Sequence, residues 1–479
     1  MAAFLVLLGV FVIARVVYRR WFHPLSHIPG PFIASVSSLY RAYWSLQPEF
    51  HDNFKRLHEK YGPIVRYGPN SIIFNDYELL AVAYGRRADK SDFFAANFDT
   101  AATFNRKKYE DHVAGKKAIA TAYSAPNLRL LESGVNNLIS RWLEALRKGT
   151  KEHGSVNLQE RAGWLAVDAV SLLITGKPLG FIESESDVRG LLYIKDNTFH
   201  WLGFLAIQEN LSWYVRNTWL GKNLVMARAT DKSGVGVFMN ERDRMIASAF
   251  HKNGDLDRSA LVEGSLISSL LNAHVAGNGM SMEDIRAEVL FALLAGSSVT
   301  PLNLWTVIFL IAKDGAVRDK LALELERAEC QGQIPSKSHI TSYEQAKSLP
   351  YLHACIQEAL RFAPTISQLP RLSPRETGMD LHGKYVPPGF SVSTSPWIIG
   401  RNKDLYGEDA DVYRPERWLE ACPAQLRYWD RNGFHFGYGG RKCAARRFAL
   451  IQLYKTAAEL VLRRGKAPED LPPSNFVSF

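Results

Sequence analysis

Cys443 lies in a segment whose residue types suit the binding of a metal-containing cofactor. Three glycines and Arg441 precede the cysteine within residues 436–445, and a helical pattern follows it. A cysteine at a helix N-terminus faces free amide groups and the positive end of the helix dipole, which favour its thiolate. Glycines let the backbone approach a flat cofactor closely, and an arginine binds a carboxylate through two hydrogen bonds. Because a thiolate is the haem-iron ligand that favours cleavage of the O–O bond, this segment predicts a haem site.

The other cysteines and the composition exclude several classes of protein. The chain has 479 residues, of which 47% are hydrophobic and 22% charged, so disordered, collagen-like and coiled-coil chains are excluded. Four cysteines in so long a chain cannot form a disulfide framework, and none is part of a CxxC pair. Three of them are predicted to be inert core residues: Cys330, Cys355 and Cys422. The net charge of +10 suits an anionic membrane, an acidic partner protein or nucleic acid equally well.

The N-terminal segment favours the membrane among these partners, and no nucleic acid is expected. Residues 2–17 are apolar except for Arg15, and Tyr-Arg-Arg-Trp-Phe follows at residues 18–22. A secretory signal carries its positive charges before its apolar stretch, not after it. About 20 residues span a bilayer, a length that is reached if Arg15 extends to the headgroups and the aromatic residues lie at the interface. We therefore predict a transmembrane anchor over residues 1–22, with the following chain on the cytoplasmic side; the alternative is an apolar helix packed on the domain.

The rest of the chain predicts one large domain, mainly α with a minor β portion, over residues 32–479. A proline-rich tether over residues 23–31 separates this domain from the anchor, because its prolines cannot continue a helix. Residues 61–76 are typical of two short strands joined by a Gly-Pro-Asn turn. A capping box at Ser281 begins a helix that is apolar nearly all round over residues 289–312. We expect that helix to be buried on every side rather than to span a membrane.

The spacing around the cysteine resembles the signature of a known family. Phe436-x-x-Gly439-x-Arg441-x-Cys443 matches the haem-binding pattern of the cytochrome P-450 superfamily, and the resemblance runs from Pro24 nearly to the end of the chain. The tether and the strand pair are similar to those of fungal microsomal members, especially the pisatin-demethylase-like group. The resemblance implies the cytochrome P-450 fold, haem b as the cofactor, and Cys443 as the thiolate ligand of its iron.

A second pair of elements matches the same family. Glu358-Ala-Leu-Arg361 resembles its ExxR helix, and Arg417 lies in residues 413–418, which match its aromatic-x-Pro-Glu-Arg-aromatic element. In an ordinary helix such a Glu/Arg pair is a surface ion pair that contributes only about 0.2–0.5 kcal/mol. The resemblance implies instead that Glu358, Arg361 and Arg417 form a buried structural triad, which holds the cysteine loop.

The resemblance also implies which side chains bind the haem propionates. His112 and Lys116 lie where the family has an aromatic residue or histidine and, four residues later, a propionate-binding arginine. Lys116 keeps the charge of that arginine but lacks its two-pronged geometry. Arg371 resembles the propionate-binding arginine that follows the ExxR helix, and Arg441 is expected to contribute as well. The alternative for each cation is a solvated surface position.

The long central helix departs from the family pattern. Where the family reads Ala-Gly-x-acid-Thr, residues 295–301 read Ala-Gly-Ser-Ser-Val-Thr-Pro. Ser298 therefore replaces the acid, and Val299 replaces the first threonine, of a pair that delivers protons to bound dioxygen in the family. The hydroxyls that remain as candidate catalytic groups are those of Ser297, Ser298 and Thr300. Together with ordered water they are expected to relay protons; the alternative is that they are only small residues that allow a kinked helix.

Two features concern the expected substrate pocket. Residues 93–104, 199–213 and 365–369 are presumed to line it, and their phenylalanines and tryptophans indicate an apolar substrate. The chain ends 36 residues after Cys443, whereas family members usually continue into a hairpin that lines the pocket. Residues 469–479 cannot supply that whole hairpin, so we expect a pocket that is open on one side or an incomplete gene product.

Together these features predict a haem-thiolate monooxygenase, of the EC 1.14 type, that oxidises a lipophilic small molecule in fungal secondary metabolism. The resemblance implies the use of O2 and of electrons from NADPH through NADPH-cytochrome P-450 reductase, whose acidic surface would suit the basic chain. The expected location is the endoplasmic reticulum membrane, spanned once. One alternative is a haem-thiolate isomerase, dehydratase or oxidative-coupling enzyme, which the change at Ser298 and Val299 favours. A second is a haem-binding protein without turnover, which the short C-terminus favours.

Overall fold

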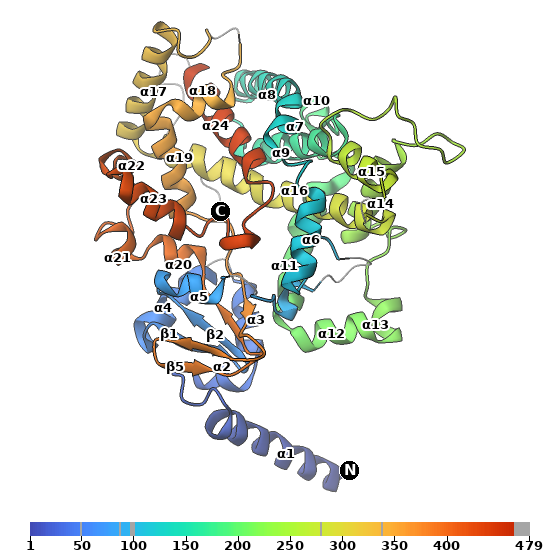
Figure 1. Cartoon of the computed structure of the whole chain (residues 1–479), viewed down its shortest axis with the longest axis vertical. Helices are drawn as coiled ribbons and strands as arrows, with labels where there is room; N and C mark the ends of the chain where they lie inside the picture. Colours follow the sequence, from blue (N-terminus) through green and yellow to red (C-terminus); the bar gives the residue numbers. More distant parts are fainter. Residues whose placement is uncertain (48–49, 86–87, 96–100, 278–279, 337–338, 464–479) are drawn as a thin grey trace.

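The structure is mainly helical with two small sheets, which confirms the predicted fold class (Figure 1). It is a computed structural model that describes the chain except residues 48–49, 86–87, 96–100, 278–279, 337–338 and 464–479. The longer helices are α1 (Ala2–Val17), α4 (Phe50–Tyr61), α6 (Tyr109–Ile119), α8 (Glu132–His153), α9 (Leu158–Thr175), α11 (Leu191–Ile207), α12 (Glu209–Asn217), α14 (Val235–Ala247), α15 (Leu266–Val275), α16 (Met282–Lys313), α17 (Gly315–Cys330), α19 (Pro350–Phe362), α23 (Pro423–Asn432) and α24 (Arg446–Arg463).

The shorter helices connect these elements. They are α2 (Phe32–Val36), α3 (Leu39–Ser45), α5 (Leu80–Ala83), α7 (Ala125–Leu130), α10 (Phe181–Ser184), α13 (Trp219–Leu224), α18 (Tyr343–Ser348), α20 (Pro396–Gly400), α21 (Lys403–Tyr406) and α22 (Glu416–Glu420). Single turns are the π-helical η1 (Tyr18–Phe22) and the 3-10 turns η2 (Tyr77–Leu79), η3 (Asp92–Phe94), η4 (Val188–Gly190) and η5 (Gly439–Arg441).

The larger sheet contains the predicted strand pair. β1 (Ile64–Gly68) and β2 (Ser71–Phe74) are antiparallel, as residues 61–76 predict, and the sheet order is β1-β2-β6-β3, with β6 (Ser391–Ser393) and β3 (Arg371–Leu372). All residues of β1 and β2 are buried, which explains their continuous apolar runs. The sheet therefore places Arg371, at the start of β3, inside the protein.

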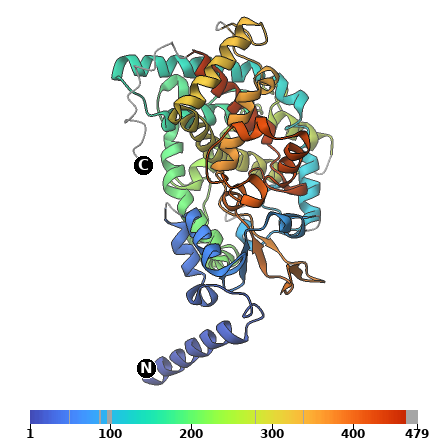
Figure 2. The same ribbon diagram turned by 90° about the vertical axis from the view of Figure 1, so that its left-hand side faces the viewer.

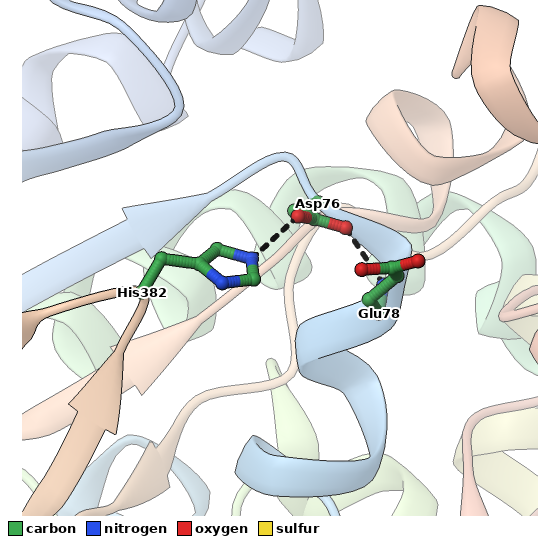
Figure 3. Close-up of side chains that lie close together, drawn as sticks. All are labelled: Asp76, Glu78 and His382. Carbon is green, nitrogen blue, oxygen red and sulfur yellow. Dashed lines mark hydrogen bonds and ion pairs between the residues drawn. The ribbon is translucent and has the colours of Figure 1, made fainter.

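The smaller sheet consists of β4 (Met379–Leu381) and β5 (Lys384–Val386). Its turn is fastened to the end of β2, because His382 Nε2 lies 2.6 Å from a carboxylate oxygen of Asp76 (Figure 3). Glu78 lies beside this pair, and its backbone amide donates to the other oxygen of Asp76. Both oxygens of Asp76 thus have protein partners at the surface.

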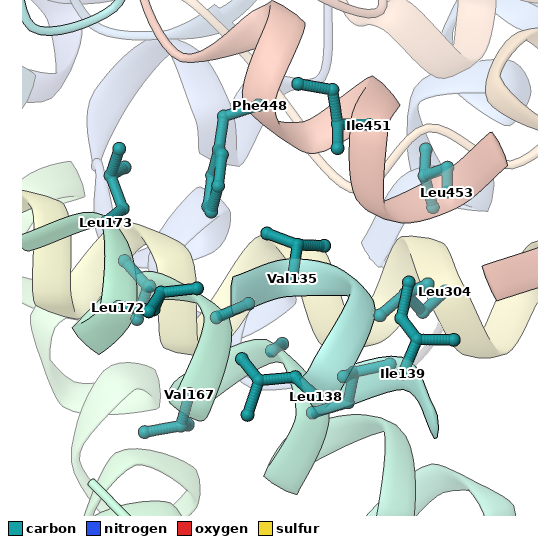
Figure 4. Close-up of a cluster of buried hydrophobic side chains, with 14 of the residues drawn as sticks. Val135, Leu138, Ile139, Val167, Leu172, Leu173, Leu304, Phe448, Ile451 and Leu453 are labelled. Carbon is teal, nitrogen blue, oxygen red and sulfur yellow. The ribbon is translucent and has the colours of Figure 1, made fainter. Parts of the chain in front are cut away.

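The core surrounds α16. Ser281 and Asp284 form the expected capping box at its start, and the helix contacts α9, α14, α19 and α24. Apolar side chains of α8, α9, α16 and α24 meet there, among them Leu173, Leu304 and Phe448 (Figure 4). The expectation that α16 is buried on every side is wrong, since Leu302 is 42% exposed halfway along it. The helix therefore has one accessible face within an otherwise packed core.

The N-terminal helix projects away from the domain (Figures 1 and 2). Ala2–Phe22 is long and apolar enough to cross a membrane, and none of its residues is buried against the protein. This contradicts the alternative in which the helix packs on the domain. α16 passes the same length and composition test but lies half-buried in the core. Where the N-terminal helix ends, Arg66 donates to the carbonyl of Arg19, and Arg19 donates to that of Val36. These bonds attach the end of the helix to β1 and α2.

Candidate active site

The cysteine loop turns sharply just before α24. The backbone amide of Cys443 donates to the carbonyl of Phe436 over 2.9 Å, which closes the loop, and Gly439 adopts a φ of +60°. A side chain at Gly439 would place its Cβ 3.0 Å from the carbonyl oxygen of Tyr84. Glycine is thus required there both for its positive φ and for this close approach. The helix begins at Arg446, so Cys443 lies just before its N-terminus, as the sequence predicts.

The electrostatic environment of the Cys443 thiol is mixed. Burial raises its pKa, whereas the amides of Ala445 and Arg446 and the charges of Lys116 and Arg446 lower it, and burial outweighs them. The helix terminus favours the thiolate as predicted, through the amides of Ala445 and Arg446, but burial, which the sequence does not show, outweighs it. Cys443 is nevertheless exposed as a residue; of the three cysteines predicted to lie in the core, Cys355 is buried, but Cys330 and Cys422 are exposed, so that prediction is wrong for these two. A bound metal deprotonates a coordinating thiol outright, so these amides and cations would stabilise a metal-bound thiolate.

The side chain of Lys116 binds the backbone of the cysteine loop. Its Nζ atom donates to the carbonyl oxygens of Gly440 and Lys442 over 2.9 and 3.0 Å. The side chain therefore reaches the cysteine loop, although the sequence suggests a propionate contact. Burial lowers the pKa of Lys116, and the charge of Cys443 raises it. A lysine suits this position because its compact ammonium group donates to two carbonyl oxygens at once.

Arg441 is bound to a different part of the chain. Its Nε, Nη1 and Nη2 atoms donate to the carbonyl oxygens of Ala88, Arg106 and Lys107 over 3.2, 3.1 and 2.8 Å. An arginine has five N–H groups, so two remain for a carboxylate. Arg441 thus connects the cysteine loop to the segments that flank η3.

The predicted triad residues meet in the core between α19 and α22. Arg361 binds Glu358 through two hydrogen bonds of 2.7 Å, and Arg417 Nε donates to the same carboxylate over 2.9 Å. Trp418 Nε1 adds a bond of 2.9 Å, which the sequence did not suggest. The remaining donors of Arg361 and Arg417 bind backbone carbonyls, including those of Ala410 and Tyr406, and Arg417 Nη1 also donates to the carboxylate of Asp409 over 2.8 Å. The triad therefore fixes the irregular segment that leads to the cysteine loop.

The glutamate of this triad is ionised. Burial by itself would raise the pKa of Glu358, but the hydrogen bonds of Arg361 and the charges of Arg361 and Arg417 outweigh burial and lower it. All three side chains are at most 2% exposed. Such a buried, fully bonded ion cluster fixes geometry, and removing one member leaves an unpaired charge.

A group of buried cations lies next to the cysteine loop. Arg371 is buried and lies over the rings of Tyr84 and Phe94, at 5.2 and 5.4 Å from their centres. Lys90 is 3% exposed and donates to the carbonyl of Phe104. Burial holds the pKa of Lys90 well below the usual range, and the positive charges of Arg371 and Arg441 lower it further. Within the described part of the chain, Arg371 and Lys90 have no acidic partner, and buried cations of this kind indicate an anionic ligand.

His112 has an unused ring nitrogen beside these cations. Its Nδ1 atom is bonded to the carbonyl oxygen of Thr103 at 3.0 Å, and its buried Nε2 has no partner among the described residues. The buried cations and the exposed cysteine fit the propionates and iron of a haem, and the Nε2 atom of His112 lies beside these cations. Sequence reasoning found His112 and Arg371 but missed Lys90, whose neighbours Asp89 and Ser91 make it look like a surface cation.

The candidate relay residues lie on two different faces of α16. Ser298 keeps accessible surface together with Ala295 and Val299, whereas Ser297 and Thr300 are buried. Ser297 and Ser298 both donate to the carbonyl of Leu294, over 3.1 and 2.7 Å. Pro301 lies within the helix and offers no amide to the carbonyl of Ser297. The structure therefore does not bring the three hydroxyls together on one face.

The presumed pocket segments are described only in part. Residues 199–213 form the end of α11 and the start of α12, and residues 365–369 lead into β3. The segment 93–104 includes residues 96–100, which lie outside the described residues, as do residues 469–479. Phe104, beyond that gap, stacks on Phe291 of α16 with 4.5 Å between ring centres. This contact places an aromatic pair on the accessible side of α16.

Comparison with known proteins identifies the family. The family model described as cytochrome P450 matches residues 25–464. This chain belongs to the cytochrome P450 family. It is 39% identical to the cytochrome P450 monooxygenase ustC of Aspergillus flavus, over 92% of this chain and 78% of that protein. It is also 30% identical to quiannulatic acid synthase of Emericella variicolor, over 89% and 84% of the two chains, and 28% identical to pisatin demethylase of Fusarium vanettenii, over 93% and 84%.

Membership settles the general chemistry of this P450. The family is haem-thiolate, with iron bound by a cysteine, so the cofactor is haem b and the protein is an oxidoreductase of the monooxygenase type. The curated relatives are fungal P450 monooxygenases, which confirms the predicted group. The apolar N-terminal helix is consistent with the membrane anchor of a microsomal P450.

Proposed function

We propose that this P450 hydroxylates or otherwise oxygenates a lipophilic small molecule of fungal secondary metabolism, with Cys443 as the thiolate ligand of the haem iron. The observation that carries the proposal is the cysteine loop, in which a closed turn presents an exposed cysteine beside buried cations. The named relatives support this class of chemistry, because they are fungal monooxygenases and a synthase and demethylase of small molecules.

The residues of the site divide into three tasks. Arg371, Lys90 and His112 would bind the propionates and so fix the plane of the cofactor, while Arg441 and Lys116 hold the loop that carries the ligand. When bound, the haem supplies the activation of dioxygen, with electron density pushed from the thiolate. The protein contributes position, charge and exclusion of water at this centre.

The accessible face of α16 would cover the distal side of the cofactor. Ala295, Val299 and Leu302 offer no proton there, so this face excludes water. Ser298 is the hydroxyl on that face; its proton goes to the carbonyl of Leu294, which leaves the Oγ lone pairs to accept from water. Ser298 would thus pass protons only by rotating away from that carbonyl. Among the three candidate hydroxyls, those of Ser297 and Thr300 would act only through intervening water.

The electron donor and location follow from the same proposal. Two electrons would come from NADPH through NADPH-cytochrome P450 reductase, with O2 as the second substrate. The anchor of residues 1–22 would span the endoplasmic reticulum membrane once, followed by the tether of residues 23–31 and by a catalytic domain, residues 32–479, on the cytoplasmic side. The exposed cation Lys117 and the loop residue Lys442 lie on the cysteine side of the site, where they suit an acidic reductase surface.

The decisive experiment is the optical spectrum of the reduced protein with carbon monoxide. The wild-type protein is expected to show the long-wavelength Soret band of thiolate ligation, and Cys443→Ala is expected to abolish it. Cys330→Ala is the matched control, because Cys330 is exposed at the end of α17 and should leave the band unchanged. A wild-type protein that binds no haem would refute the proposal.

One observation favours a second candidate function. Because α16 lacks the acid and threonine of ordinary oxygen activation, a haem-thiolate isomerase, dehydratase or oxidative-coupling enzyme would need less of this relay. Conversion of substrate that requires both NADPH and O2, with one oxygen atom from O2 in the product, distinguishes the monooxygenase from an isomerase. Conversion without either reagent would favour the alternative.

A further inference from the structure

The hydrogen bond of His112 fixes the tautomer of its ring. Its Nδ1 atom lies 3.0 Å from the carbonyl oxygen of Thr103. A carbonyl oxygen only accepts hydrogen bonds, so Nδ1 must carry a proton in this contact. In the neutral ring the other nitrogen, Nε2, then has a lone pair and no proton. His112 therefore presents an acceptor, and not a donor, at the buried nitrogen that has no partner among the described residues.

Thr103 is itself fastened to α16, which makes this tautomer hard to exchange. The backbone amide of Thr103 donates to the carboxylate of Glu288, and both side chains are buried. A ring flip of His112 would replace Nδ1 by a carbon and leave the Thr103 carbonyl without its donor. Glu288 thus acts as a positioning residue, which keeps the carbonyl of Thr103 aimed at Nδ1.

The charges around His112 distinguish it from His58, another buried histidine. His58 of α4 shows the same pattern, with Nδ1 bonded to the carbonyl of Gly62 at 3.0 Å and a buried Nε2 without a partner in the described part of the chain. Burial lowers the pKa of both rings to about 4. Only His112, however, has cations among the charges that act on it.

Those cations come from three different parts of the chain. They are Arg441 of η5, Lys90 ahead of η3, and Lys116 of α6 itself. Glu288 of α16 is connected to His112 through the backbone of Thr103. A propionate brought among these cations would supply the negative charge that the surroundings of Nε2 lack.

A carboxylate and an unprotonated nitrogen cannot form a hydrogen bond with each other, because both only accept. We propose that His112 takes up one proton at Nε2 when the haem propionate binds, and that it is a doubly protonated imidazolium in the holoenzyme. Nδ1–H then donates to Thr103, and Nε2–H donates to the propionate. The proton comes from solvent, and no bond other than N–H is made or broken. This inference rests on the proposed function, since it requires the haem.

The inference makes the iron centre sensitive to pH through one residue. When the shared proton leaves at high pH, the imidazole becomes neutral and the negative charge of the propionate is no longer offset. A more negative surrounding stabilises the ferric over the ferrous iron, so the reduction potential falls as pH rises. An indole N–H donates permanently and has no second state, so a tryptophan at position 112 would remove this pH dependence.

The test is the pH dependence of the reduction potential of the full-length holoenzyme, measured by spectroelectrochemistry without substrate. The wild-type potential is expected to fall with rising pH more steeply than the potentials of His112→Trp and His112→Phe. His58→Phe is the matched control, because it removes a histidine of the same tautomer and burial, and its profile should follow the wild type. Equal slopes in the wild type and both His112 variants would overturn the inference.

A second measurement covers the case in which the His112 variants lose their haem. Nitrogen-15 spectra of histidine-labelled wild-type protein, in the reduced carbon monoxide complex, report the protonation of each ring nitrogen. His58→Phe removes the His58 signals and so distinguishes them from those of His112. We expect His112 to show both nitrogens protonated at neutral pH; a neutral ring there would overturn the inference. Absence of the thiolate Soret band would instead refute the proposed function, so the two failures are distinct.

Discussion

Lys116 Nζ lies 3.0 Å from the carbonyl oxygen of Lys442, the residue that directly precedes Cys443. A second bond of 2.9 Å reaches the carbonyl of Gly440. The cysteine loop is therefore held on α6 by one ammonium group. The sequence predicts a propionate contact for Lys116; the structure adds that Lys116 binds the backbone of the cysteine loop.

Replacing Lys116 by methionine is expected to loosen the ligand loop. Hydrogen bonds to charged groups contribute about 1.5–3 kcal/mol each, so the variant should lose the thiolate-type Soret band of its carbon monoxide complex at a lower urea concentration. Lys117→Met is the control, because Lys117 is exposed on the same helix. This variant should leave unchanged the urea concentration at which half of the Soret band is lost. An unchanged midpoint in Lys116→Met would show that the two bonds contribute nothing to the loop.

Replacing Glu358 by glutamine is expected to destabilise the fold by about 3–5 kcal/mol at neutral pH, because two buried arginines lose their shared charge. Burial raises the pKa of Glu358 in the folded protein, but the hydrogen bonds and charge of Arg361 and the charge of Arg417 outweigh burial, so the pKa is lowered. Its contribution is therefore present above the ordinary glutamate pKa and is lost as pH falls below it. Urea unfolding of the wild type and variant should thus converge in acid.

The exposed pair of Arg414 and Glu420 provides the comparison for this measurement. Arg414 Nη1 and a carboxylate oxygen of Glu420 lie 2.6 Å apart, but both side chains are solvent-exposed. Glu420→Gln should therefore change the free energy of unfolding by at most about 1 kcal/mol. A similar effect of Glu358→Gln would contradict the structural role of the triad.

Deleting residues 1–22 is expected to weaken membrane binding without releasing the protein completely. The haem spectrum should survive, since no residue of α1 is buried against the domain. Large apolar side chains remain exposed after the deletion on α2–α3 and α12–α13, including Phe32, Ile33, Trp213 and Trp219. Vesicle sedimentation should show partial binding of the truncated protein, which falls further after Trp213→Ser and Trp219→Ser. Binding equal to that of the full-length chain would contradict the anchor.

Restoring the family pattern on α16 is expected to change how efficiently NADPH is used. General acid–base assistance is typically worth about 10²–10⁴-fold, so the lack of an acid beside Val299 should make reduced oxygen leak as superoxide or peroxide. Ser298→Asp with Val299→Thr should raise the ratio of product to NADPH consumed. Val299→Thr alone serves as the control, because it adds a hydroxyl but no acid.

Two other outcomes of that double substitution are informative. Falling turnover would indicate that a substrate hydroxyl already occupies the place of the acid and is crowded by the new carboxylate. Tight coupling of the unmodified enzyme on substrates without any hydroxyl would contradict an impaired relay. In that case Thr300 and water suffice, even though Thr300 is buried away from the accessible face of α16.

Several features were predictable from local sequence because local physics fixes them. The capping box at Ser281 marks the start of α16, and the Gly-Pro-Asn turn gives the pair β1 and β2. The closed loop around Cys443 follows from the glycine and arginine spacing within a few residues. The triad was found through its motif, but its fourth partner, Trp418, was not, since an indole N–H gives no sign in the sequence of what it donates to.

The sequence by itself determined the helical fold, the loop around Cys443 and the apolar N-terminal helix, since each depends on the order of neighbouring residues. The tertiary structure decided the tasks of the cations. Lys116 and Arg441 bind backbone carbonyls of distant segments, and Lys90 joins Arg371 in a buried group. A charged side chain takes whichever partner the fold brings within reach, and residues hundreds of positions apart meet only when the core has formed.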